Sequence, residues 1–408
     1  MSKSFNITFP EYTPQRLAIK LNAAGERSVR NGHPWIFSDS IIKLNKEGQA
    51  GDLAIIFSYT KNEVIGIGLY DPESPIRIKL LHHNNPATIN EAFFEDKIAR
   101  AYSLRAELLD TKTNSYRLLF GENDGFPSLI ADVYASVLVI KVYSAIWLPY
   151  LKTIINQLIS VSEVETVVMR LSRKLQNYPD IPFKDGAVLH GELPSEEISF
   201  KEHGVNFKAN VIKGHKTGYF LDHRHNRKRV GVLSKGKKVL DVFSYAGGFS
   251  VHALAQGAKE VTSIDISSQA LEIAKENTHL NSFNGTHKTV VGDAFEILKN
   301  LVSNGEQYDI VIIDPPSFAK SQKEIIIANK KYRQLAQFGS MLTAKGGMLV
   351  LASCSSRVTT ASFFEINAKA ISDLKIKYDL TLKTAHDIDH PVTFKEGSYL
   401  KCGYYKIM

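Results

Sequence analysis

The chain has 408 residues, of which 44% are apolar and 23% are charged, so it is long enough for two or three domains and too apolar for a disordered protein. The net charge of +8 favours a polyanionic partner, although charge alone does not establish one. Only two cysteines occur, Cys354 and Cys402, which excludes a disulfide framework and a multi-cysteine zinc site, and we expect no metal.

No apolar run approaches the roughly 18 residues of a membrane helix, and the N-terminal segment lacks the form of a secretion signal. We therefore expect a cytoplasmic protein that does not associate with membranes.

Residues 12–86 contain short β-rich runs separated by turn signals such as Asn31-Gly32 and Asp71-Pro72. This pattern predicts a small N-terminal β-barrel. The runs are RLAIKL at 16–21, DLAIIF at 52–57, VIGIGLY at 64–70 and IRIKLL at 76–81.

Residues 87–203 predict a central α+β domain. A helix is expected from Ala87 to Leu109, where Phe93, Ile98, Ala101 and Leu104 approximate a helical stripe. Strand-like runs at 127–134, 136–143 and 166–172 follow, with a helix over 147–160 between the second and the third.

Residues 204–408 repeat the order strand, glycine-containing turn, helix, which predicts a doubly wound parallel sheet of the Rossmann-like kind. The expected strands are 237–243, 260–266, 287–294, 308–316 and 346–355, and the expected helices include 248–257, 268–280, 296–304 and 362–374.

In such a sheet the ligand lies beyond the carboxyl ends of the strands. The first strand leads into the turn DVFSYAGGF, and a glycine pair in this turn lets backbone approach a ligand. Two bulky residues stand where a dinucleotide fingerprint needs glycines, which argues against an NAD-linked oxidoreductase. The candidate cofactor residues here are Asp241, Phe243, Ser244, Tyr245, Gly247, Gly248 and Phe249.

The second strand ends in Asp265-Ile266 and the third in Asp293-Ala294. Acids at three strand ends, without a Walker lysine, suit a ligand with ribose, adenine and a sulfonium cation, and we expect S-adenosylmethionine. The alternative is that these acids only cap the helices that follow them.

The fourth strand ends in Asp314-Pro315-Pro316 and the fifth in Ser353-Cys354-Ser355. Strands four and five are neighbours in a sheet of this kind, so the Asp314 carboxylate and the Cys354 thiol should face one pocket. Cytosine explains the pair, because thiolate addition at carbon 6, with an acid at nitrogen 3, makes carbon 5 nucleophilic. Cys354 should then lie where its thiolate is stabilised.

A lone cysteine at a strand end is more often a buried small hydrophobe, and only the neighbouring Asp314 motif favours the nucleophile for Cys354. Cys402 has no comparable neighbours, and we interpret it as structural.

These motifs resemble those of the ribosomal RNA large subunit methyltransferase I family, whose members methylate carbon 5 of cytosine in 23S rRNA. The resemblance covers nearly the whole chain. Its specific segments are NGHPWIFSDS at 31–40, GENDGFPSLIADVY at 121–134, GHKTGYFLDHRHNR at 214–227, DVFSYAGGF at 241–249, GDAF at 292–295, DPPSF at 314–318, SCS at 353–355 and DHPVTFKEGSYLKCG at 389–403.

The resemblance implies a PUA-like domain over 12–86, a central domain of the EEHEE type over 87–203 and a class I methyltransferase domain over 204–408. It also implies that one segment lies over the cofactor, with Arg224 holding it in place. The residues of that segment are Lys216, Thr217, Phe220 and Asp222, and Pro315 adds to the cofactor site.

The chain departs from the family pattern at three positions. His215 stands where glutamine is expected, and His225 where aspartate is expected. Ser317 replaces a second cysteine that assists product release in some relatives, so release here would need another base.

The sequence identifies an RNA-binding surface less sharply. Cations and an aromatic ring in the N-terminal domain are suited to phosphates and stacked bases, although a solvated face with Trp35 in the barrel core is an equal alternative. The candidates are Arg27, Arg30, His33, Trp35 and Arg77. The implied partner is 23S rRNA, and a homodimer is compatible with the sequence.

Two other functions stay open. A guanine methyltransferase acting at N7 or N2 would share the FLDHR and DPP segments but would not need Cys354. An RNA-binding protein on the same fold would not need Asp265, Asp314 and Cys354.

Overall fold

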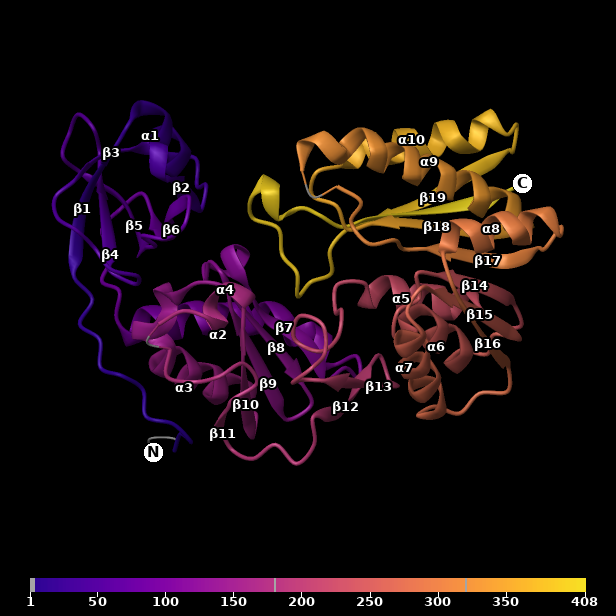
Figure 1. The fold of residues 1–408 in the computed structure, drawn as a ribbon, viewed down its shortest axis with the longest axis horizontal. Helices are drawn as coiled ribbons and strands as arrows, with labels where there is room; N and C mark the ends of the chain where they lie inside the picture. The colour runs from indigo at the N-terminus through magenta and orange to yellow at the C-terminus, as the bar shows by residue number, and fades with distance from the viewer. Residues whose placement is uncertain (1–3, 180, 320) are drawn as a thin grey trace. The chain divides into compact units, whose positions relative to one another are not determined.

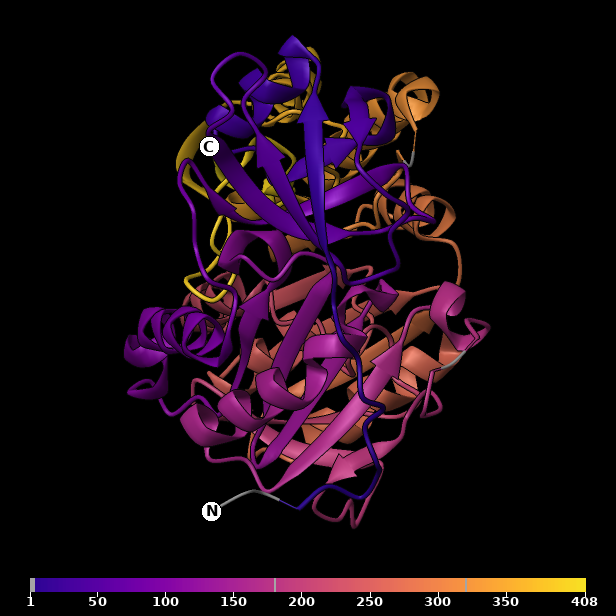
Figure 2. The same cartoon turned by 90° about the vertical axis from the view of Figure 1, so that its left-hand side faces the viewer.

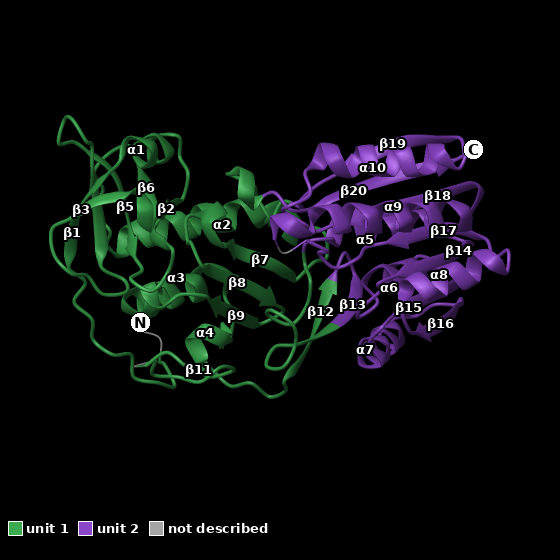
Figure 3. Ribbon diagram, turned by 45° about the horizontal axis from the view of Figure 1, so that its top comes forward, with its two compact units in different colours: residues 1–201, 208–221, 388–397 green, residues 202–207, 222–387, 398–408 purple. Residues whose placement is uncertain are grey.

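The computed structural model describes residues 4–179, 181–319 and 321–408, and the chain divides into two compact units, coloured separately in Figure 3. Unit 1 contains residues 1–201, 208–221 and 388–397, and unit 2 contains residues 202–207, 222–387 and 398–408. Domain boundaries at 86 and 203 stay predictions. Within the described ranges, no helix is long and apolar enough to cross a membrane.

The first sheet of unit 1 has six strands in the order β2-β6-β5-β4-β1-β3, drawn in indigo at the top of Figure 2. All four predicted β-rich runs form strands of this sheet. Its core consists of alternate strand residues such as Leu17, Ile19, Ala54 and Ile56, none of which is exposed. The strands are β1 (Arg16–Leu21), β2 (Trp35–Phe37), β3 (Ile41–Leu44), β4 (Leu53–Phe57), β5 (Val64–Tyr70) and β6 (Ile76–His83).

The sheet is accompanied by a helix that the sequence patterns did not predict, α1 (Ala23–Arg30). It begins after Asn22, whose side chain accepts a hydrogen bond from the Gly25 N–H. This N-cap satisfies one of the free amide groups of the first turn.

The second sheet of unit 1 has the order β11-β10-β9-β8-β7, with β9 and β10 parallel (Figure 1). Its elements are β7 (Ser115–Phe120), β8 (Leu129–Tyr134), β9 (Val137–Val142), β10 (Thr166–Leu171), β11 (Val188–His190), α2 (Glu91–Leu109), α3 (Leu151–Ser162) and α4 (Arg173–Gln176). A two-stranded sheet follows, formed by β12 (Glu197–Glu202) and β13 (Val205–Asn210).

Two details of the predicted helices were wrong. Leu104 is 52% exposed, because the buried face of α2 continues from Ala101 to Arg105 instead. The second helix does not begin at Trp147: residues Ala145–Tyr150 form a 3₁₀ helix, η3, which contains Pro149. Proline has no N–H to donate, and α3 begins only after it.

Unit 2 contains a seven-stranded sheet in the order β16-β15-β14-β17-β18-β20-β19. Strands β16, β15, β14, β17 and β18 are parallel, and β17 and β18, the fourth and fifth predicted strands, are neighbours as predicted. The expectation of a wholly parallel sheet was wrong, since β20 runs antiparallel to both β18 and β19. The strands are β14 (Lys238–Val242), β15 (Glu260–Asp265), β16 (Thr286–Val291), β17 (Tyr308–Ile313), β18 (Thr343–Ser353), β19 (Tyr378–Thr384) and β20 (Lys401–Ile407).

Both faces of this sheet are covered by helices, and neighbouring strand residues point to opposite faces. Val239 and Val350 pack in one apolar cluster with residues of α5 and α6, whereas Leu240 and Leu351 pack in another with residues of α8, α9 and α10. The helices are α5 (Arg224–Leu233), α6 (Gly248–Ala255), α7 (Ser268–His279), α8 (Ala294–Ser303), α9 (Ile325–Leu342) and α10 (Thr360–Asp373).

Candidate functional site

Asp241, at the end of β14, is 1% exposed, and only one of its carboxylate oxygens is paired. Its Oδ2 accepts hydrogen bonds from the N–H and the hydroxyl of Ser250, at 3.0 and 2.6 Å. Its Oδ1 is buried without a hydrogen-bond partner among the described residues. Burial raises the pKa of Asp241 to about 7, the hydrogen bonds from Ser250 oppose this shift, and the charges of Asp314 and Asp265 add to it.

The turn after β14 has an uncommon backbone. Phe243 and Tyr245 lie in the left-handed region, with φ of 64° and 48°, and Gly247 follows at 78°. Residues other than glycine adopt this backbone conformation rarely, and strained residues of this kind are common at functional sites. A Cβ on Gly247 would lie 2.8 Å from the Cβ of Ala274, so this glycine also allows α7 to pack closely.

The strained turn is held against the end of β15. The Ser244 N–H donates to the Ile264 carbonyl at 3.0 Å, and the Tyr245 N–H donates to Asp265 Oδ2 at 2.9 Å. Phe249 is 6% exposed, whereas Ile266, directly after Asp265, is 74% exposed. The turn and the Asp265 carboxylate are therefore held together by hydrogen bonds.

The three predicted acids behave differently as helix caps. Asp293 caps α8, because its Oδ1 accepts hydrogen bonds from the N–H groups of Phe295 and Glu296. Asp265 does not cap α7, since the side chain of Ser267 does so. Asp241 reaches the first turn of α6 but keeps one oxygen unpaired. Ala294, which begins α8, is 5% exposed.

The segment that should lie over the cofactor is divided between the units. In unit 1, Thr217 donates from its hydroxyl to Asp132 at 2.5 Å, and the Lys216 ammonium lies 4.9 Å from the centre of the Phe220 ring. In unit 2, the Asp222 carboxylate accepts a hydrogen bond from the Tyr399 hydroxyl at 2.9 Å.

Asp314 and Cys354 follow the neighbouring parallel strands β17 and β18, as the sequence predicts. The Cys354 thiol lies 3.8 Å from the carbonyl oxygen of Pro315, the residue directly after Asp314. Cys354 and Asp314 are both half-buried, whereas Cys402 is fully buried. The thiol and the carboxylate thus belong to adjoining strand ends.

Comparison with known proteins identifies the family. A family model for S-adenosylmethionine-dependent methyltransferases matches residues 117–392, and a model for PUA-like domains matches residues 19–83. The ribosomal RNA large subunit methyltransferase of Deinococcus radiodurans is 40% identical over 399 residues, covering 96% of this chain and 98% of that protein. The ribosomal RNA large subunit methyltransferase I of Shewanella frigidimarina is 33% identical over 393 residues, covering 94% and 98%. The chain belongs to the ribosomal RNA large subunit methyltransferase I family.

Solved structures agree on the fold of this methyltransferase. A protein from Streptococcus mutans, described as a SAM-dependent methyltransferase, has a TM-score of 0.80 at 21% identity and covers 95% of this chain and 99% of its own. A methyltransferase crystallised with SAH also has a TM-score of 0.80 at 21% identity, covering 96% and 100%. The predicted fold class is confirmed, with a PUA-like domain, a central α+β domain and a class I methyltransferase domain.

S-adenosylmethionine is the cofactor of this methyltransferase. The strand ends of unit 2 fit it chemically, because the unpaired Asp241 oxygen can accept a hydrogen bond from a cationic ligand. Asp265 can in addition accept from ribose hydroxyls, since each of its oxygens receives a single backbone N–H.

Sequence reasoning missed His223, which touches Asp314. The His223 Nε2 lies 3.4 Å from Asp314 Oδ1, and its Nδ1 accepts a hydrogen bond from the Asn226 amide at 3.1 Å. The ring N–H therefore faces Asp314. Burial is the largest single effect and lowers the pKa of His223, but the charge and contact of Asp314 and the charge of Asp222 together outweigh it and raise the pKa. The FLDHR segment contained this residue, but nothing in the sequence linked it to Asp314.

Sequence reasoning also missed Lys401, the first residue of β20. Lys401 is 2% exposed, and its ammonium donates to the carbonyl oxygens of Ser355 and Tyr399. A lysine between Leu400 and Cys402, both buried, was the available signal, because lysine is almost never fully buried without a partner.

The candidate RNA-binding residues differ in their exposure and in their contacts with other residues. Arg27 and Arg30 are exposed on α1, and Arg30 pairs with Glu26 at 2.9 Å. Arg77 is half-buried and donates to the carbonyl oxygen of Pro72. His33 lies beside Trp35, with 5.7 Å between the ring centroids.

Trp35 is half-buried, so it is neither a core residue nor a free surface ring. Its indole N–H donates to Glu122 at 3.1 Å, and its ring lies 5.2 Å from that of Phe394. A cavity of about 370 Å³ in unit 1 is lined by Glu122 together with Lys97 and Arg100. An aromatic group and two cations therefore share one region of unit 1.

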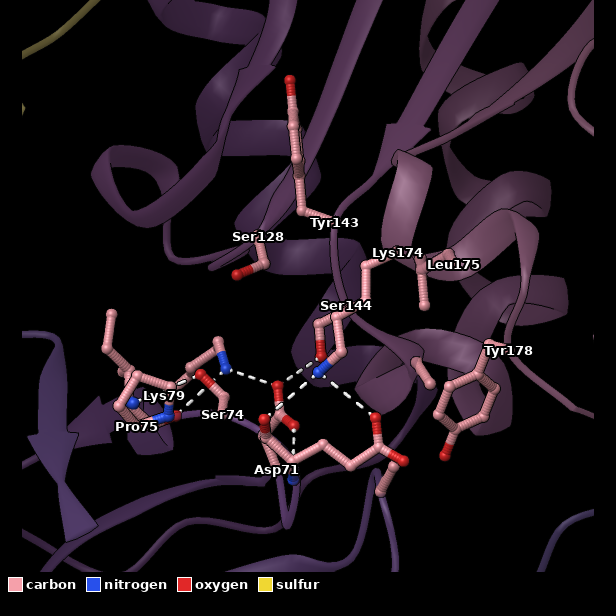
Figure 4. A pocket seen from close by; sticks show the side chains of 14 residues that line it. Asp71, Ser74, Pro75, Lys79, Ser128, Tyr143, Ser144, Lys174, Leu175 and Tyr178 are labelled. Carbon is pink, nitrogen blue, oxygen red and sulfur yellow. Dashed lines mark hydrogen bonds and ion pairs between the residues drawn. The ribbon is translucent and has the colours of Figure 1, made fainter. Parts of the chain in front are cut away.

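A second cavity of unit 1, of about 260 Å³, contains no predicted site residue among those that line it (Figure 4). Asp71 lies between Lys79 and Ser144 and accepts a hydrogen bond from each at 2.6 Å. These buried polar groups satisfy one another, which is typical of a structural network.

Proposed function

We propose that this methyltransferase forms 5-methylcytidine in 23S ribosomal RNA, with Cys354 as a covalent nucleophile. The observation that carries the proposal is the 3.8 Å separation between the Cys354 thiol and the Pro315 carbonyl, directly after Asp314. A guanine methyltransferase has no use for a thiol at this position. Cytoplasmic location and homodimer formation stay predictions from the sequence.

Each catalytic group would act on one atom of the cytosine. The Cys354 thiolate forms a bond to carbon 6, and the Asp314 carboxyl group holds a proton at nitrogen 3, so that electron density moves to carbon 5. S-adenosylmethionine, when bound, supplies an electrophilic methyl group. Removal of the carbon 5 proton by a base then restores the double bond between carbons 5 and 6 and expels the thiolate, and the proton at nitrogen 3 returns to the Asp314 carboxylate.

The first step needs Asp314 at a fixed position. His223 directs its N–H toward one Asp314 oxygen, and the buried Asn226 amide holds the ring from the other side. We infer that His223 positions Asp314. Ser317, which replaces the second cysteine of some relatives, donates from its hydroxyl to the Ala319 carbonyl at 3.3 Å. Cys354 would therefore be the single covalent catalyst.

RNA contact is proposed for the region of unit 1 that contains Trp35. Its aromatic neighbours offer a stacking surface, and Lys97 and Arg100 in the adjacent cavity offer cations for phosphates. The target base must leave its stack to reach a thiol, which costs a few kcal/mol and favours loops or unfolded precursor RNA.

The test is to incubate the protein with labelled S-adenosylmethionine and deproteinised 23S rRNA, then to digest the RNA and identify the labelled nucleoside. We expect label in 5-methylcytidine, loss of activity in Cys354→Ala and retained activity in the matched control Cys402→Ala. Label in a guanine nucleoside, or full activity of Cys354→Ala, would contradict the proposal.

A further inference from the structure

We propose that Lys401 is a positioning residue that holds a buried positive charge beside Cys354 and thereby keeps this thiol ionised for attack. This inference rests on the proposed function of Cys354 and adds a residue whose role no comparison assigns.

The strand pairing brings Lys401 to the end of β18. Strand β20 runs antiparallel to β18, and Lys401 is the register partner of Ser353, the residue directly before Cys354. The Lys401 ammonium then donates to the carbonyl oxygen of Ser355, the residue directly after Cys354. The backbone on both sides of the cysteine is therefore in contact with Lys401.

The ammonium has little freedom to leave. A second hydrogen bond joins it to the Tyr399 carbonyl at 2.9 Å, and the residue is 2% exposed. Two carbonyl acceptors therefore fix the position of the Lys401 charge, whereas the charge of a flexible surface lysine would have no fixed position.

The charge of Lys401 lacks an acidic partner. No carboxylate among the described residues forms an ion pair with it, and burial lowers its pKa to about 8, whereas the nearby Cys354 is the group that raises it. A buried cation without a counter-ion is costly, so a thiolate at Cys354 would stabilise the pair.

Other ionisable groups near Cys354 do not supply this effect. Asp314 is an acid and opposes a thiolate, and His223 is directed at Asp314. Burial raises the pKa of Tyr332 to about 12, so this phenol stays neutral. Lys401 is thus the cation among these groups that favours the thiolate.

The chain offers a direct assay, because its two cysteines differ sharply in accessibility. Cys402 is fully buried, and burial strongly raises its pKa, so it should not react in the folded protein. Alkylation by iodoacetamide as a function of pH should therefore report Cys354 alone, with Cys354→Ala as the blank.

We expect the wild-type thiol to reach half-maximal alkylation at a lower pH than free cysteine in the same buffer. Lys401→Met should raise the pKa of Cys354 by about one, so that it reacts about tenfold more slowly at a pH below both pKa values, and Lys401→Arg should keep most of the wild-type rate. Methylation by Lys401→Met should recover as the pH is raised, which a structural defect would not produce.

Wild-type alkylation that follows the pH profile of free cysteine would overturn the proposal, even if Lys401→Met fails to fold. An unchanged profile in a folded Lys401→Met would overturn it as well. Alkylation does not depend on methyl transfer, so an active Cys354→Ala with a shifted Lys401→Met profile would contradict the proposed function and leave the role of Lys401 intact.

Discussion

Two buried carboxylates, Asp132 in unit 1 and Asp241 in unit 2, have opposite surroundings. Asp132 receives two hydrogen bonds from the Arg117 guanidinium, both at 2.8 Å, and a third from Thr217. Asp241 receives two from Ser250 on one oxygen, and its other oxygen has no partner among the described residues. The pairing compensates for the burial of the Asp132 charge, whereas the half-paired Asp241 carboxylate costs stability and has an oxygen available to a ligand.

The largest effect should follow from breaking the paired site. Arg117→Met leaves the Asp132 carboxylate buried without its cation, and we expect the free energy of unfolding to fall by about 3–5 kcal/mol. Urea denaturation measures this change. The control is Arg100→Met, an exposed arginine whose pair with Asp96 should contribute under about 0.5 kcal/mol. Equal losses in both variants would contradict the comparison.

Substitution of the half-paired Asp241 should change the free energy of unfolding in the opposite direction. Asp241→Asn removes a buried charge but keeps an oxygen for Ser250, so the free energy of unfolding at pH 8 should rise by about 1–3 kcal/mol. Affinity for S-adenosylmethionine should fall at least about tenfold, because the asparagine side chain is neutral toward a cationic ligand. Denaturation together with calorimetric titration tests both parts. A variant that is less stable and binds normally would show that Asp241 is structural.

The stability and the cofactor affinity of the wild type should both depend on pH through the ionisation of Asp241. The folded pKa of Asp241, about 7, is above that of an unfolded carboxyl group, so its contribution to stability is present in acid and is lost as the pH rises through about 7. Cofactor affinity should rise over the same interval, because the ionised form binds the cation. The rise should be absent in Asp241→Asn, and an equal rise in both proteins would exclude this carboxylate as its cause.

The smallest effect on stability is expected at an exposed pair. Arg30 can exchange Glu26 for an RNA phosphate without burial, so Arg30→Ala should change the free energy of unfolding by under about 0.5 kcal/mol. RNA affinity at low salt should fall a few-fold, and the slope of affinity against salt should decrease. Filter binding over a salt series gives both values. An unchanged slope would remove Arg30 from the RNA-binding surface.

Local patterns in the sequence were sufficient for elements that depend on local apolar runs. The strand that ends before Asp314 and the strand that ends before Cys354 both followed from such runs and from the strand–turn–helix order. The antiparallel strand β20 could not be predicted in this way, because no crossover helix precedes it and its residues pair with segments that are distant in the chain.

The roles of the residues that sequence reasoning missed or left open depend on partners that are distant in the chain. His223 and Lys401 gain their roles from Asp314 and Cys354, which are distant in the chain. The sequence left open whether Asp293 caps a helix, and only the backbone of the first turn of α8 showed that it does, while its role as a cofactor residue stays a prediction. Lys401 could be suspected from its apolar neighbours, but its partner could not.

The most direct measurement of the central claim is to trap the adduct on Cys354. With RNA that contains 5-fluorocytidine, carbon 5 has no proton to lose after methylation, so the covalent bond between the thiol and carbon 6 should persist. Protease and nuclease digestion followed by mass spectrometry should then find a methylated fluorocytidine on the peptide that contains Cys354, and none in Cys354→Ala. Turnover on normal RNA without any trapped peptide, or an adduct on another residue, would contradict the account.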